Sequence, residues 1–138
     1  MTLSTVVLSV LLFAAAMTDL LHNKIYNAHT VAMLAAGLLT SVITGGFGAL
    51  PTALLSALIT FALMLPVYLI KGIGAGDVKL LTGAAAFLVP AQLPAFIGVS
   101  FVLAAVYGAG RLVVSRGKRR TIRFAVPVFL SGVILCAV

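Results

Sequence analysis

Long apolar stretches make up most of this 138-residue chain, and short polar or glycine-rich breaks separate them. A helix that crosses a bilayer needs about 20 predominantly apolar residues. The pattern predicts six membrane helices, the fourth of them short, at about residues 3–18, 30–44, 51–70, 77–89, 95–114 and 124–138. We therefore expect an all-α, polytopic membrane protein in which residues 1–138 form a single transmembrane domain.

Glycine and proline mark the predicted breaks. Gly45–Gly48 reads as a turn, and Pro51 suits the first turn of the helix that follows it. Pro66 predicts a kink in the third helix. Residues 72–76 form a glycine-rich break before the fourth helix, and residues 90–94 form a turn after it.

The composition supports the membrane assignment. Hydrophobic residues make up 63% of the chain and charged residues 8%, whereas a soluble domain is about 25% charged. The single cysteine, Cys136, excludes an intrachain disulfide and a cysteine-based zinc tetrad. We expect no metal and no cofactor.

The basic residues indicate the orientation of the helices. They follow the first helix (Lys24), flank the third break (Lys71 and Lys79) and otherwise fall within residues 111–123. Under the positive-inside rule, six helices with both termini outside fit this distribution. We read the net charge of +7 as topology information and expect no nucleic-acid partner. Ala14–Ala16 resembles a signal-peptide cleavage site, but no basic residue precedes Lys24, so we expect a retained helix.

The chain contains only two acidic residues, Asp19 and Asp77. Asp19 ends the first predicted helix and Asp77 begins the fourth, so both are predicted at the cytoplasmic face. An ionisable group at membrane depth costs about 2.5–3.5 kcal/mol. Two adjacent carboxylates share a proton, so one can activate water while the other donates to an oxyanion. Such a pair titrates as a unit, and the sequence assigns no fixed role to either residue.

Position alone leaves other interpretations of these acids open. Asp77 suits the first turn of a helix, where a carboxylate is stabilising. Asp19 could form an ion pair with Lys24. Paired acids inside a membrane protein also serve proton or cation transport.

The residues around both acids resemble the type IV prepilin peptidases, the GxGD membrane aspartyl proteases. Gly74–Asp77, with Lys79 following, is similar to the GxGDxK signature of that family. Asp19 followed by residues 25–27 (Ile-Tyr-Asn) is similar to the family pattern of Asp, five residues and Ile-Pro-Asn. The sequence departs from that pattern at Tyr26, where proline is common.

The resemblance implies a six-helix aspartic endopeptidase with Asp19 and Asp77 as catalytic residues. The motif adds Gly74, Gly76, Lys79 and Asn27 as supporting residues. The implied substrate is the leader peptide of a prepilin or pseudopilin, cleaved after a glycine at the cytoplasmic face of the inner membrane. A final helix that opens with Phe124–Pro127 is also similar to the family pattern.

The chain looks like the short, peptidase-only type associated with tight-adherence (Flp) pili. It has no domain with paired CxxC motifs, and methyl transfer is not expected. Two alternatives from other functional classes stay open: a small proton-coupled transporter and a noncatalytic subunit of pilus assembly.

Four further features carry expectations. Asn27 is expected to cap the second helix and to hold the loop near Asp19. His22 is expected in a loop or at the membrane interface, with a hydrogen bond to the two acids as the alternative. Lys79 is expected to extend toward the interface, or to position substrate or carboxylate. The basic run at residues 116–123 is expected to anchor the topology near anionic headgroups.

Overall fold

A computed structural model describes residues 3–22, 25–71, 73–114 and 125–137. These residues form six α-helices and two short 3₁₀ turns: α1 (Leu3–His22), α2 (Asn27–Gly45), η1 (Phe47–Ala49), α3 (Leu50–Leu69), α4 (Ala75–Ala85), η2 (Pro90–Gln92), α5 (Leu93–Val114) and α6 (Ala125–Ala137). The predicted all-α class is therefore confirmed. The expectations placed on Lys24, on residues 116–123 and on Phe124 lie outside the described residues.

Four stretches of the described chain are long and apolar enough to cross a membrane: Leu3–His22, Asn27–Gly45, Phe47–Leu69 and Pro90–Gly110. Helix α6 is a shorter apolar helix. Helix α4 has 11 residues, so it rises only about 16 Å, against a hydrocarbon core of about 30 Å. It begins two residues earlier than the predicted fourth helix (residues 77–89) and ends four residues earlier than that helix.

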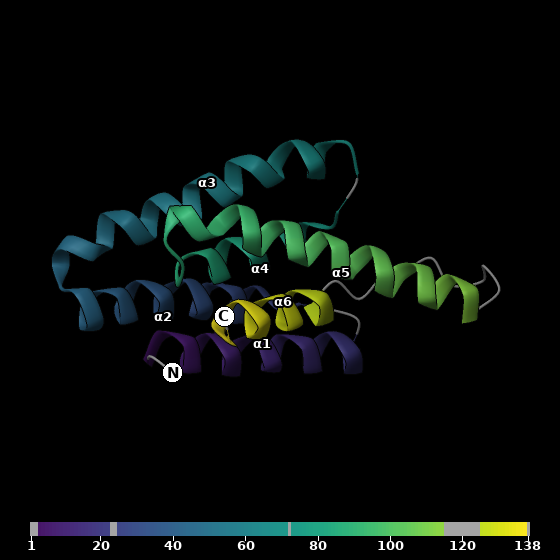
Figure 1. Ribbon diagram of the computed structural model, residues 1–138, viewed down its shortest axis with the longest axis horizontal. Coiled ribbons are helices and arrows are strands. Elements are labelled where there is room, and N and C mark those ends of the chain that lie inside the picture. Colours follow the sequence, from purple (N-terminus) through teal and green to yellow (C-terminus); the bar gives the residue numbers. More distant parts are fainter. Residues whose placement is uncertain (1–2, 23–24, 72, 115–124, 138) are drawn as a thin grey trace.

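The short helix α4 lies among longer helices. It packs mainly against α3 and α2, while α6 packs against α1 and α5 (Figure 1). The carboxyl end of α1 and the amino end of α4 lie toward the same end of the molecule (Figure 1). This arrangement allows residues from α1 and α4 to meet, although they are distant in the sequence.

Small residues let α2 and α4 approach each other closely. A side chain added at Gly37 on α2 would place its Cβ 2.7 Å from the Cβ of Ala86, just after α4. A Cβ added at Gly83 on α4 would lie 3.3 Å from the carbonyl oxygen of Thr30 on α2. Because these contacts advance together along both helices, α2 and α4 run parallel.

Some of the breaks between helices occur at the predicted glycine and proline positions, and one differs. Helix α2 ends at Gly45, and Gly46 has a φ of 72°, a conformation that glycine adopts without strain. Pro51 lies in the first turn of α3, as predicted. The third break is narrower than the glycine pattern suggested, because Ala75 and Gly76 already belong to α4.

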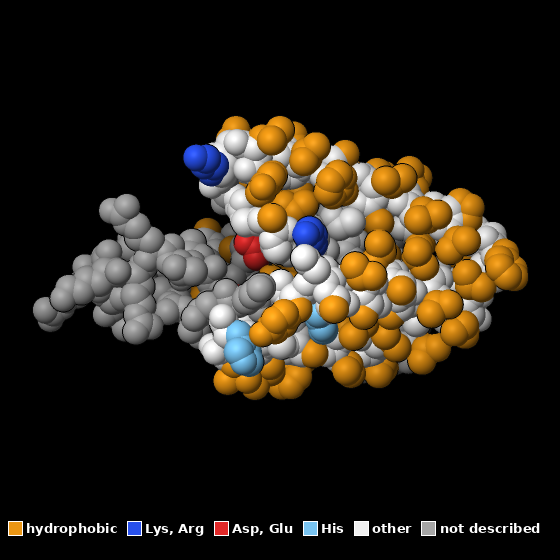
Figure 2. All heavy atoms as spheres, turned by 180° about the vertical axis from the view of Figure 1, so that it is seen from behind, with side chains coloured by type: hydrophobic (Ala, Val, Ile, Leu, Met, Phe, Trp, Pro, Cys, Tyr) orange, Lys and Arg blue, Asp and Glu red, His pale blue; other side chains and the backbone are white. Residues whose placement is uncertain are grey.

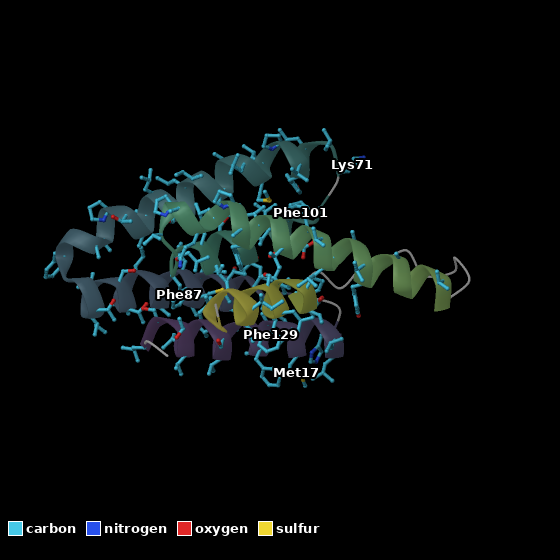
Figure 3. The ribbon with its side chains drawn as sticks, in the orientation of Figure 1. Met17, Lys71, Phe87, Phe101 and Phe129 are labelled. Atoms are coloured by element: carbon cyan, nitrogen blue, oxygen red, sulfur yellow. The ribbon has the colours of Figure 1, made fainter. Side chains whose placement is uncertain are left out.

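Aromatic and hydroxyl contacts join α6 to its neighbours. The rings of Phe13 on α1 and Phe129 on α6 meet edge to face, with centroids 5.7 Å apart, and Figure 3 shows Phe129 at α6. The buried hydroxyls of Ser100 on α5 and Ser131 on α6 are 2.6 Å apart. Buried hydroxyl pairs of this kind stabilise helix packing where water is excluded.

Hydrophobic side chains cover most of the visible surface, and the acidic and lysine side chains gather toward one end (Figure 2). Exposed apolar residues occur on every long helix, for example Phe13, Leu39, Leu58 and Val106. A water-soluble protein rarely exposes so large a continuous apolar surface. The described helices therefore form a multi-pass membrane protein.

Candidate active site

Asp77 lies in the first turn of α4. This agrees with the interpretation of Asp77 as an acid that stabilises the start of a helix. Its Oδ2 accepts a hydrogen bond from the backbone N–H of Gly74, with a nitrogen–oxygen distance of 3.2 Å. Gly74 itself is extended and precedes the helix. The carboxylate thus satisfies one of the N–H groups that every helix start leaves without an intrahelical partner.

The two motif glycines have different structural roles. A Cβ added at Gly74 would lie 3.3 Å from Oδ2 of Asp77, so a side chain there would crowd the carboxylate. A Cβ added at Gly76 would lie 3.5 Å from the Cβ of Ile25, which is an ordinary packing distance. A side chain at Gly74 would therefore have to displace the Asp77 carboxylate by a few tenths of an ångström, whereas the geometry asks for no such shift at Gly76.

Asp19 lies near the carboxyl end of α1, as predicted, and the helix continues past the predicted end to His22. Only 8% of its surface is exposed. The neighbouring Ala15 and Ala16 are also buried in the core. Helix α1 therefore turns Asp19 toward the interior of the bundle.

The two carboxylates interact electrostatically. The pKa of Asp77 is raised from 3.8 to about 6: burial raises it most, the hydrogen bond from Gly74 lowers it, and the charge of Asp19 raises it. Like charges disfavour joint ionisation at short range. The fold thus brings Asp19 from α1 and Asp77 from α4 close enough to influence each other's protonation.

Lys79 and Asn27 are brought together by α4 and α2. The Nζ atom of Lys79 donates a hydrogen bond to Oδ1 of Asn27, with a distance of 2.9 Å. The prediction that Asn27 caps α2 is wrong, because Tyr26 occupies the cap position and makes no side-chain cap bond. The amide of Asn27 instead accepts from Lys79, which makes it a link between two helices.

His22 is exposed at the end of α1, as predicted for an interfacial residue. Its ring meets the ring of Tyr26 edge to face, with centroids 6.2 Å apart. Tyr26 stands where the resembled family commonly has proline. The two rings therefore pack together at the connection between α1 and α2.

Sequence reasoning missed two buried hydroxyls on α3. Ser56 and Thr60 are fully buried, and their hydroxyl oxygens have no hydrogen-bond partner among the described residues. Their spacing of four residues places them on one face of the helix. Two hydroxyl residues at that spacing within an otherwise apolar stretch could have indicated a buried polar face on this helix.

The arrangement supports acid–base chemistry on a bound water. A carboxyl group with a pKa near 6 carries its proton in part of the population near neutral pH. In a pair of carboxyl groups that shares one proton, the ionised member can accept a proton from water. A protonated carboxyl group also donates a hydrogen bond to an oxygen that gains negative charge.

Comparison with known proteins gives one match. A family model described as the type IV leader peptidase family matches residues 6–109, which is more than half of the chain and includes Asp19, Asn27, Gly74–Asp77 and Lys79. A search of curated proteins gives no match, and a search of solved structures gives none either.

Proposed function

The chain belongs to the type IV leader peptidase family, and we propose that it is an aspartic endopeptidase whose catalytic groups are Asp19 and Asp77. The observation that carries the proposal is the coupling between these residues: burial, followed by the charge of Asp19, raises the pKa of Asp77 to about 6 against the opposing hydrogen bond from Gly74. A pair of carboxylates that holds one proton is the arrangement that aspartic proteases use.

In this proposal the ionised member of the pair takes a proton from a water molecule, which attacks the scissile carbonyl carbon. The protonated member donates a hydrogen bond to the carbonyl oxygen as it becomes an oxyanion. The proton taken from water then passes to the leaving amine as the C–N bond breaks. Because the pair titrates as a unit, either carboxylate can carry the proton in the resting state.

The proposed substrates are prepilin-like precursors with a short leader, cleaved at the cytoplasmic face of the inner membrane. The tight-adherence (Flp) type is the proposed pilus class. Asp19 lies near the carboxyl end of α1 and Asp77 near the amino end of α4, and these two helix ends lie toward the same end of the molecule (Figure 1). A site at that end suits a scissile bond just outside an apolar substrate helix.

Co-expression with a candidate prepilin tests the proposal. Asp19→Asn and Asp77→Asn should each abolish leader removal, read as a mobility shift and by mass spectrometry of the product. Lys71→Gln is the control, because it also removes one charge but changes an exposed side chain beyond α3 (Figure 3). Circular dichroism should show that all three variants keep their helix content.

Unchanged leader removal by both Asp variants would contradict the peptidase proposal. It would direct attention to proton-coupled transport or to a noncatalytic role in pilus assembly.

A further inference from the structure

A furrow lies between α2, α3 and α4 and has a volume of about 260 Å³. Its walls are mainly apolar, with Val31 and Leu34 from α2 and Phe61 from α3. Lys79 and Asn27 line it at the end where α2 and α4 begin. The furrow therefore has a cationic entrance and an apolar interior.

The furrow belongs to a different side of α4 from the two acids. Lys79 follows Asp77 by two residues, which is a rotation of about 200° around an α-helix. Asp77 interacts with Asp19 of α1, whereas Lys79 reaches α2. A ligand in the furrow would therefore leave the carboxylate pair accessible.

The furrow is an open groove whose walls are almost entirely apolar. An extended apolar chain can lie along such a groove, and in a bilayer the most abundant chain of that kind is a lipid acyl chain.

The residues at the entrance of the furrow favour the binding of an anionic group. Lys79 has an ammonium group with three donors, and the acceptor in its described hydrogen bond is the neutral amide oxygen of Asn27. Asn27 is the first residue of α2, where the helix dipole is also positive. A phosphate group would complement both charges.

Two residues that line the furrow are exposed on the outer surface of the bundle. Val31 is 65% exposed and Phe61 is 44% exposed, and both belong to helices long enough to cross a membrane. A lipid can therefore enter sideways from the membrane without passing through the bundle.

We propose that this furrow binds one anionic phospholipid, with an acyl chain along Val31, Leu34 and Phe61 and the headgroup phosphate at Lys79. This proposal does not rest on the proposed peptidase activity. It assigns the cationic entrance to a resident lipid that links the beginnings of α2 and α4 at the bilayer surface.

Native mass spectrometry of the full chain, purified with phosphatidylglycerol or phosphatidylcholine, tests the headgroup. The wild type should retain phosphatidylglycerol in preference to phosphatidylcholine. Lys79→Gln should lower that preference by about fivefold, because one basic residue near an anionic surface contributes on that scale. Lys71→Gln, which removes an exposed lysine that does not line the furrow, should leave the preference unchanged.

A second pair of variants tests the acyl-chain position. Val31→Trp should fill the furrow and lower retention of both lipids. Leu39→Trp is the matched control, because Leu39 lies on the same helix, is 62% exposed and does not line the furrow. Both tryptophan variants should keep the wild-type helix content by circular dichroism.

Equal retention of the two lipids by the wild type would overturn the proposal, as would equal behaviour of Val31→Trp and Leu39→Trp. A third experiment adds an extended apolar peptide with one acidic residue as a competitor of the lipid. If it displaces phosphatidylglycerol at lower concentration than the lipid itself, and does so only when Lys79 is present, the furrow is a peptide site.

Discussion

The ammonium group of Lys79 lies 2.9 Å from the amide oxygen of Asn27, although the two residues are 52 positions apart in the sequence. The hydrogen bond joins the fifth residue of α4 to the first residue of α2. It therefore links α4, the helix that carries Asp77, to α2.

A double-mutant cycle tests whether this bond stabilises the fold. Lys79→Met and Asn27→Leu should each lower the free energy of unfolding, and the double variant should lose less than the sum. We expect a coupling of about 0.5–1.5 kcal/mol, which is typical of one intramolecular hydrogen bond. Unfolding in a lipid-free zwitterionic detergent, followed by circular dichroism, measures it. Strictly additive losses would show that the two side chains act independently.

The sequence was sufficient to predict the helical class and the proximity of Asp19 to Asp77. Uncharged apolar stretches have few alternatives to a helix in a bilayer, since each must satisfy its own backbone hydrogen bonds. Breaks at Gly45–Gly48 and Pro51 were predicted correctly because glycine and proline restrict local geometry directly. These are local properties, and a single sequence contains them.

The failures concern contacts between distant segments. Asn27 has the residue type of a helix cap, but its amide is used by Lys79 from another helix. The length of α4 was overestimated because apolar residues continue past Ala85, where the chain nevertheless turns. The furrow depends on three helices at once, so no sequence window could reveal it.

Asp77 makes stability depend on pH in a specific direction. Its folded-state pKa of about 6 exceeds the ordinary value of 3.8, so the folded state binds more protons between these values. Stability should therefore be highest below pH 4 as far as this group is concerned, and should fall as the pH rises to about 6. The contribution is at most ~3 kcal/mol.

Asp77→Asn should remove this dependence. The asparagine oxygen can still accept the hydrogen bond from Gly74, but it carries no charge to be buried. We expect the variant to melt at a higher temperature than the wild type at pH 7.5, and the difference to shrink toward pH 4. Thermal melts by circular dichroism in buffered detergent at several pH values measure it. A lower melting temperature for the variant at pH 7.5 would contradict the assigned pKa.

Gly37 should be the most restrictive glycine between α2 and α4. An alanine there would bring its Cβ within 2.7 Å of the Cβ of Ala86, so the two helices would have to move apart. We expect Gly37→Ala to destabilise the protein by about 1–3 kcal/mol, the usual cost of overpacking. The melting temperature in detergent measures the loss.

Gly98 on α5 provides the matched control, because a Cβ added there meets no atom within 4 Å. Gly98→Ala should leave stability unchanged or raise it by up to about 1 kcal/mol, since alanine favours a helix more than glycine does. Equal effects of the two substitutions would show that close approach of α2 and α4 does not limit the packing.

The shortness of α4 has a consequence for how the protein is made. Helices α1, α2, α3 and α5 contain stretches that can each enter the bilayer unaided, whereas an 11-residue segment is too short to insert as a spanning unit. We expect α4 to reach its final position only after α2 and α3 have inserted and can pack against it. Asp77 would then reach Asp19 late in biogenesis, so a half-assembled chain would lack the carboxylate pair on which the proposed peptidase activity depends. Insertion of α4 by itself in a translocon assay would argue against this order.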